Sequence, residues 1–167
     1  MEEWKIIEDY PNYSISNIGN IKNNKTGKFL KPSINLDGYL QLNLCNDGKR
    51  KAYRFHRLLA LTFLQKIEGK NIVDHIDRNK LNNSLDNLRW VSISENNRNI
   101  NKKNGTLSIY RGVSFHKINN KFISSIKINN KTIYLGRYKT EKEAAIAYNN
   151  YIIENNVSCA ILNNITD

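Results

Sequence analysis

Three side chains in the middle of the chain have the types and spacing to hydrolyse a phosphodiester bond. Asp74 and His75 are adjacent, and Asn96 follows further along. The reaction needs a nucleophilic water, a base that deprotonates it and a cation that offsets charge on the phosphate. Asp74 and Asn96 offer oxygen ligands for a divalent cation. Because imidazole titrates near neutral pH, His75 is the natural general base.

An adjacent Asp and His are weak evidence alone, since Asp74 could merely neutralise His75 on a surface loop. The surrounding pattern adds a scaffold: a brief strand over 72–75, a polar loop over 77–87, a second strand over 88–91, and a helix opened by a capping box at 92–95. Neighbouring residues of a strand point to opposite sides, so the loop must bend for both side chains to address one phosphate. The expected unit is therefore ββα.

Charge divides the chain into an acidic island between basic flanks. The 167 residues carry a formal net charge of +11, and residues 98–140 hold ten Lys and Arg but no Asp or Glu. Residues 67–96 instead hold five acidic side chains. Clustered cations gain free energy by displacing counterions from phosphate, so a polyanionic partner is favoured over a merely well-solvated surface.

The flanking patterns predict an α+β protein of three modules. Short alternating strands and Asp-Gly turns fill residues 1–55, with a hairpin expected at Asp47-Gly48. A short helix over 56–64 precedes the ββα unit, so residues 56–104 form the second module, ending in a polar linker over 101–105. Three strands over 111–116, 122–128 and 132–138, then a helix capped at 140–143, give a three-stranded antiparallel sheet with one helix in residues 105–167.

The run Val73-Asp74-His75-Ile76-Asp77-Arg78-Asn79-Lys80-Leu81-Asn82-Asn83, followed by Asn87-Leu88-Arg89-Trp90-Val91 and Asn96, resembles the motif of the HNH endonucleases. It is most similar to the phage-type homing endonucleases, in which Asn replaces the final His. The resemblance implies that His75 is the base, that Asp74 and Asn96 hold one Mg²⁺ or Mn²⁺ ion, and that Asn87 is the supporting catalytic residue. Arg78 departs from the Gly frequent at its position.

His56 resembles the His of an H-R-L-x-A segment that precedes this motif, and a structural role at the helix start is favoured for it. Residues near the N-terminus, such as Glu3-Trp4-Lys5 and Tyr13-Ser14-Ile15-Ser16-Asn17, resemble the NUMOD4-like module attached to such nucleases. This second resemblance supports the same family.

The C-terminal third resembles an AP2 DNA-binding domain through Arg111-Gly112-Val113, Tyr134-Leu135-Gly136-Arg137-Tyr138, Glu143-Ala144-Ala145 and Asn163. In that family the sheet, rather than a helix, enters the major groove. The resemblance implies that seven side chains face DNA: Arg111, Ser114, His116, Ser125, Lys127, Thr132 and Tyr134. Of these, Arg111 and Lys127 are the leading candidates for base or phosphate contact.

The sequence thus predicts a site-specific, metal-dependent endonuclease that nicks double-stranded DNA. A DNA-binding regulator with an inactive nuclease unit is the first alternative, although the intact set of four motif residues speaks against it, and a basic RNA-binding or scaffold protein is the second. Cys45 and Cys159 have no zinc or disulfide spacing. Without a signal peptide or a membrane-length apolar run, we expect a soluble, intracellular, phage- or virus-encoded monomer with no membrane or obligate protein partner.

Overall fold

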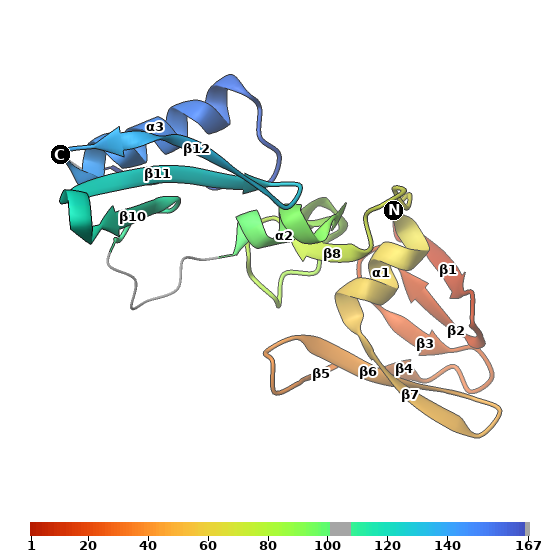
Figure 1. Ribbon diagram of the computed structural model, residues 1–167. Helices are drawn as coiled ribbons and strands as arrows, with labels where there is room; N and C mark the ends of the chain where they lie inside the picture. The colour runs from red at the N-terminus through yellow and green to blue at the C-terminus, as the bar shows by residue number, and fades with distance from the viewer. Residues whose placement is uncertain (101–107, 166–167) are drawn as a thin grey trace. The chain divides into compact units, whose positions relative to one another are not determined.

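The computed structural model describes residues 1–100 and 108–165, and its chain divides into two compact units, 1–92 and 93–167. Small antiparallel sheets and short helices build both units, which confirms the expected α+β class (Figure 1). The linker expected at 101–105 lies outside the described residues. None of the described helices has the length and apolar character needed to cross a membrane.

Two small sheets form the N-terminal part of the first unit. The first runs in the order β1-β2-β3-β4 and the second in the order β5-β6-β7, with antiparallel pairing throughout. Their strands are β1 (Trp4–Ile7), β2 (Tyr10–Ser16), β3 (Ile21–Asn23), β4 (Phe29–Leu30), β5 (Ser33–Ile34), β6 (Leu40–Asn46) and β7 (Lys49–Arg54). The hairpin expected at Asp47-Gly48 joins β6 to β7, and both turn residues have positive φ, 48° and 75°. The sequence-based hairpin is confirmed.

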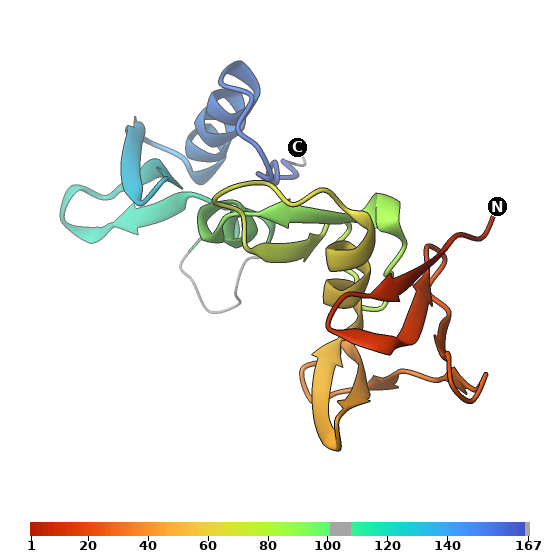
Figure 2. The ribbon, with the colours of Figure 1, turned by 90° about the vertical axis from the view of Figure 1, so that its right-hand side faces the viewer.

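Helix α1 (Phe55–Phe63) lies beside the strands of the first unit (Figure 2). Its bounds agree to within one residue with the helix expected over 56–64. Leu58, Leu59 and Ala60 are almost fully buried, in a core that also contains residues of β2, β6, β8 and β9. One continuous core therefore extends across the boundary predicted between residues 55 and 56. The division into modules 1–55, 56–104 and 105–167 stays a prediction.

Strands β8 (Ile72–His75) and β9 (Leu88–Val91) form a two-stranded antiparallel sheet, as the sequence predicted. The long loop between them ends in a short 3-10 helix, η1 (Leu85–Asn87). Val73 pairs with Trp90, and both are buried in the shared core. The next pair in the register, Asp74 opposite Arg89, places these two side chains on the other face. Because Val73 and Trp90 pack in the core, the Asp74 and Arg89 side chains are placed on the opposite face of the β8–β9 sheet.

The second unit is a three-stranded antiparallel sheet with a helix across one face (Figure 1). Its elements are α2 (Ile93–Asn99), β10 (Val113–His116), η2 (Lys117–Asn119), β11 (Lys121–Ile128), β12 (Lys131–Tyr138) and α3 (Glu141–Glu154). The capping box expected for α3 is present: the Thr140 side chain accepts a hydrogen bond from the Glu143 backbone N–H, and the Glu143 carboxylate accepts one from the Thr140 N–H. Ala144 and Ala145 are fully buried, so small side chains let α3 approach the sheet.

Strand β10 begins at Val113 rather than at Arg111, because the preceding Gly112 has a φ of +68°. An added Cβ at Gly112 would overlap the Tyr148 ring of α3 and would lie 2.6 Å from the carbonyl oxygen of Ser125. This glycine therefore combines a left-handed backbone with a close approach to the Tyr148 ring, which leaves no space for a Cβ atom.

We predict that Gly112→Ala destabilises the second unit by about 3 kcal/mol, from about 1 kcal/mol of left-handed strain and about 2 kcal/mol of overpacking. Gly48→Ala is the matched control, since Gly48 also has positive φ but has no atom near its Cβ position. Amide hydrogen exchange would measure the effect, at β11 and α3 for Gly112→Ala and at β6 and β7 for Gly48→Ala. Equal loss of protection in the two variants would contradict the packing argument.

Candidate functional site

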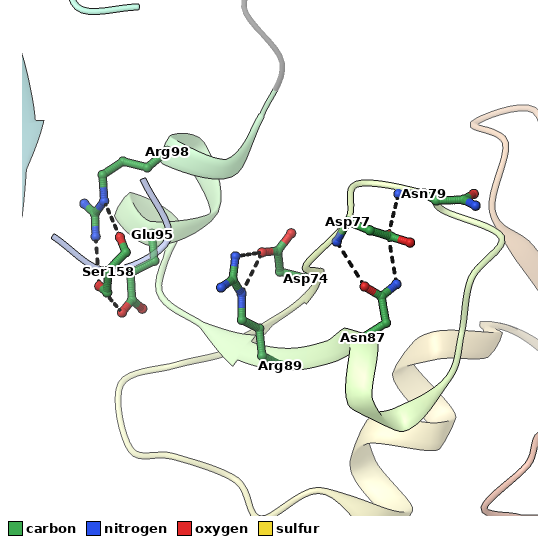
Figure 3. Close-up of polar contacts among 8 residues, drawn as sticks. All are labelled: Asp74, Asp77, Asn79, Asn87, Arg89, Glu95, Arg98 and Ser158. Carbon is green, nitrogen blue, oxygen red and sulfur yellow. Dashed lines mark hydrogen bonds and ion pairs between the residues drawn. The ribbon is translucent and has the colours of Figure 1, made fainter. Parts of the chain in front are cut away.

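Asp74 forms an ion pair with Arg89 across the β8–β9 ladder (Figure 3). The Nε and Nη2 atoms of Arg89 donate to the same carboxylate oxygen, Oδ2, at 3.1 and 2.9 Å. Asp74 is 9% exposed, so the arginine compensates a charge largely removed from water. The sequence analysis did not select Arg89; only the strand register could have identified it.

His75 ends β8 and is buried among polar and aromatic side chains. Its Nε2 lies 3.0 Å from Oδ1 of Asn83, whose amide nitrogen donates to the carbonyl of Leu81 at 3.1 Å. Since Oδ1 is an acceptor, this geometry selects the tautomer that carries the proton on Nε2. Centroid distances of 4.8 Å to the His56 ring and 6.1 Å to the Tyr39 ring place two further aromatic side chains beside His75. Asn83 fixes the orientation of the imidazole.

Asn87 holds the loop between the two strands closed (Figure 3). Its Oδ1 accepts from the Asp77 N–H at 3.0 Å, while its Nδ2 donates to the Asp77 carboxylate and to the Asn82 carbonyl, both at 2.8 Å. Its carbonyl accepts from the Ile76 N–H at 2.8 Å. These four hydrogen bonds hold the loop in its conformation, and the supporting catalytic role of Asn87 stays a prediction.

The loop turns immediately after His75. The Arg78 N–H donates to the His75 carbonyl at 3.0 Å, and Arg78 has a φ of +66°. Asp77 stabilises the same turn by accepting hydrogen bonds from Asn79, Asn82 and Asn87, which hold the pKa of its carboxyl below the ordinary value. A left-handed residue at this position explains why Gly is frequent there in the motif that the chain resembles. The bend that the sequence analysis required is therefore present.

Asn96, the second expected metal ligand, lies on α2 and is half-buried. It belongs to the second unit, whereas Asp74, His75 and Asn87 belong to the first. The structure thus brings three of the four motif residues together on one strand and its loop. The shared metal site of Asp74 and Asn96 stays a prediction.

His56 is buried at the start of α1, and its Nδ1 has no hydrogen-bond partner among the described residues. Burial chiefly, together with the nearby His75, Arg54 and Arg57, lowers the pKa of His56 to about 4. The structural role favoured from the sequence is consistent with this packing, although the partner is an aromatic cluster rather than a hydrogen bond.

A pH dependence of stability follows for the first unit. The pKa of His56 is lower in the folded state than the ordinary value of 6.5, so protons bind preferentially to the unfolded chain below that pH. We predict that the free energy of unfolding falls by about 2 kcal/mol between pH 7 and pH 4.5. Urea denaturation at the two pH values measures this, and His56→Gln should flatten the difference. If the free energy of unfolding of His56→Gln falls between pH 7 and pH 4.5 as much as that of the wild type, His56 is not the group responsible for the pH dependence.

The second unit presents a sheet face opposite α3, and six of the seven expected DNA-facing residues lie on it. The strand register pairs Ser125 with Tyr134 and Lys127 with Thr132, and pairs of this kind share a face. The face is formed by Ser114, His116, Lys121, Ile123, Ser125, Lys127, Thr132, Tyr134 and Arg137. Lys121 and Arg137 were not selected from the sequence. Alternation along β11 indicates Lys121, whereas Arg137 shares the face because the register between β11 and β12 shifts by one residue at Ser124/Ser125.

Arg111, the seventh residue, precedes β10, and hydrogen bonds to its backbone hold it in place. Oδ1 of Asn163 accepts from the Arg111 N–H at 2.6 Å, and Nδ2 of Asn163 donates to the Arg111 carbonyl at 3.1 Å. Asn149 of α3 in turn bonds both backbone groups of Asn163, at 2.7 and 2.9 Å. The sequence analysis noted Asn163 without a role. Its role here is to anchor the start of the strand.

A ββ hairpin that carries Asp74 and His75 over a loop held by Asn87, followed by a helix that carries Asn96, defines the class of the HNH endonucleases. Family models match in two places: the NUMOD4 motif over residues 2–45 and the HNH endonuclease model over residues 53–98. The chain belongs to the HNH endonuclease family.

The most similar relatives include viral proteins of known family. The DNA endonuclease I-HmuI of Bacillus phage SP01 is 41% identical over 119 residues, which cover 71% of this chain and 68% of that protein. An uncharacterised HNH endonuclease, L245, of Acanthamoeba polyphaga mimivirus is 39% identical over 80% of this chain, which spans only 41% of its length. A solved structure described as DNA binding and cleavage by the HNH homing endonuclease I-HmuI has a TM-score of 0.50, with 46% identity over 54% of this chain and 52% of that chain.

These findings confirm the resemblance to HNH homing endonucleases and to the NUMOD4 motif. The sheet and helix implied for the C-terminal third are present, and its AP2-like character stays a prediction.

Proposed function

We propose that this protein is a site-specific DNA endonuclease that nicks one strand of a duplex with the help of a divalent metal and of His75 as general base. The observation that carries the proposal is the placement of His75 beside Asp74 at the end of β8, with its imidazole fixed by Asn83. Membership in the HNH family and similarity to a phage enzyme named as a DNA endonuclease support the choice of substrate.

In the proposed reaction a water oxygen attacks phosphorus and His75 takes one proton of that water. The bond between phosphorus and one sugar oxygen breaks, and this oxygen leaves as a hydroxyl after taking a proton from solvent water. With Nε2 protonated and bonded to Asn83, the lone pair of His75 is on Nδ1. His75 therefore receives the proton at Nδ1. Asn83 and the loop held by Asn87 restrict the ring to this orientation, which saves the cost of ordering it during the reaction.

The donor set fits Mg²⁺ or Mn²⁺ better than zinc. Asp74 offers a carboxylate and Asn96 an amide oxygen, and the described residues contain no group of three or more His, Cys, Asp or Glu that could enclose a metal. HNH nucleases generally depend on a divalent metal. When bound, the metal offsets charge on the scissile phosphate. One Asp74 oxygen is already bonded by Arg89, so the pair holds the carboxylate in one orientation.

The second unit is proposed to position the nuclease on its target through the sheet face opposite α3. That face carries Lys121, Lys127 and Arg137 with no acidic residue among its members, which suits a phosphate backbone. Ser125, Thr132 and Tyr134 add side chains able to reach base edges. Because the chain has one HNH match, the proposed product is a nick made by a monomer.

The direct test is incubation of supercoiled plasmid DNA with the protein and Mg²⁺ or Mn²⁺. We expect conversion to the open circle by the wild-type protein, no conversion in EDTA, and none by His75→Ala. Binding of DNA without nicking in any divalent metal would instead favour a DNA-binding regulator with an inactive nuclease unit.

A further inference from the structure

A cavity of about 660 Å³ lies within the second unit, between α2 and the sheet. Its walls come from α2, the segment before and along β10, the middle of β11 and Tyr148 of α3. The β10 strand pairs with β11 only as far as Ser124, because Gly112 turns the chain away and its carbonyl accepts the Ser125 N–H at 2.8 Å. The cavity lies beside Ser125–Lys127, beyond the last pair of the β10–β11 register.

Three cationic side chains line the cavity, and its lining includes no Asp or Glu. They are Arg98 of α2, Arg111 and Lys127. Arg98 donates to the carbonyl and hydroxyl oxygens of Ser158 (Figure 3). It also donates to the hydroxyl of Ser94, so all three acceptors are uncharged. The side chain of Lys127 has no hydrogen bond or ion pair within the described ranges 1–100 and 108–165, whereas its backbone pairs with Thr132 in the sheet. Two of the cations, Arg98 and Lys127, therefore form no ion pair within the described part of the chain, and the Glu95 carboxylate is connected to Arg98 only through Ser158.

The remaining walls combine aromatic rings with short polar side chains. Phe115 and Tyr148 supply ring surface, and Ser94 and Asn97 supply hydrogen-bonding groups. The volume lies within the usual range for sites that enclose a small molecule. Burial raises the pKa of the Tyr148 hydroxyl, and the positive charges of Arg111 and Arg98 oppose this shift. Phosphate chemistry and a ring system together are the features of a nucleotide.

We propose that this cavity binds a phosphate-bearing nucleotide unit, with Arg98 and Lys127 on the phosphate and the aromatic walls on the base. The nucleotide comes either from the DNA strand held by the nuclease or from a free nucleotide. The strand source rests on the proposed function, because Arg98 shares α2 with Asn96 and a bound nucleotide there would hold the strand next to the helix that carries this expected metal ligand.

In the first arm of the test, the whole chain is titrated with the dinucleotide pdTdT, and binding is measured by the chemical-shift changes of its backbone amides in NMR spectra. We expect saturable shifts concentrated at Gly112, Ser125 and Lys127, and at least a tenfold weaker affinity in Lys127→Gln. The Lys127 side chain makes no hydrogen bond or ion pair, so Lys127→Gln should leave the fold of the unit intact. Arg98→Gln is the second variant. Lys142→Gln, the same charge change on the exposed surface of α3, should bind as the wild type does. Scattered shifts, or equal binding by Lys127→Gln and Lys142→Gln, would overturn the proposal.

The second arm identifies the source with duplex DNA, whose affinity is measured at several salt concentrations. If the strand supplies the nucleotide, Arg98→Gln, which lies outside the sheet face, should lower the slope of log K against log salt by about 1, whereas Lys142→Gln should leave it unchanged. Binding of pdTdT with an unchanged slope for duplex DNA assigns the cavity to a free nucleotide. If the protein binds pdTdT but nicks no DNA, the proposed nucleotide site in the cavity is supported and the proposed function is refuted.

Discussion

Replacing His75 by alanine is expected to lower the nicking rate by about 10²- to 10⁴-fold, the usual contribution of a general base. The imidazole is buried and fixed by Asn83, so solvent or a neighbouring side chain cannot easily replace it. His56, although its ring centroid is only 4.8 Å away, is held in the neutral form by burial and belongs to the core of the unit. The measurement is the first-order rate of conversion of supercoiled plasmid in Mg²⁺.

Added imidazole offers a control for this variant, because it can occupy the space vacated by the His75 ring and restore part of the rate in His75→Ala. Asn83→Ala should lower the rate less, by about tenfold, since it removes the orienting bond and leaves the base. Nicking by His75→Ala within threefold of the wild type would contradict the assignment of the base.

Replacing Asp74 by asparagine is expected to lower nicking by about 10³-fold and to weaken binding of Mn²⁺. Loss of a metal ligand removes several kcal/mol of charge stabilisation in the transition state, and each 1.36 kcal/mol corresponds to a factor of ten. Asparagine keeps the shape of the side chain and an oxygen for Arg89, so the β8–β9 ladder should survive. Circular dichroism verifies that it does.

Asp86→Asn is the matched control for Asp74→Asn, because Asp86 lies in η1 of the same loop but is exposed. Isothermal titration with Mn²⁺ separates the metal effect from any change in the chemical step. If Asp74→Asn binds Mn²⁺ as the wild type does and still fails to nick, Asp74 acts through Arg89 rather than as a metal ligand.

Much of the local structure was predictable because hydrophobic alternation and turn residues determine it. The Asp47-Gly48 hairpin, the strands at 72–75 and 88–91, and the capping box at Thr140 follow from short-range patterns. Alternation along β11 and β12 also predicted which side chains share the sheet face. These features depend on neighbours in sequence, which is why one sequence was sufficient.

The contacts that tune the site were not predictable in the same way. The Arg89 ion pair depends on the register between two strands that a long loop separates, and the Asn83 bond depends on how that loop closes. The packing of His56 against His75 joins a helix to a strand across the core. The early end of β10 at Gly112, and the cavity beside it, depend on the position of the Tyr148 ring.

Selection of cleaved products from a random duplex library, with mapping of each nick, tests the central claim most directly. We predict enrichment of one sequence, nicked at a fixed position on one strand, in Mg²⁺ or Mn²⁺ and in neither EDTA nor reactions with His75→Ala. Nicks without sequence enrichment, or the same nicks made in EDTA or by His75→Ala, would contradict a site-specific, metal-dependent endonuclease that uses His75 as its base.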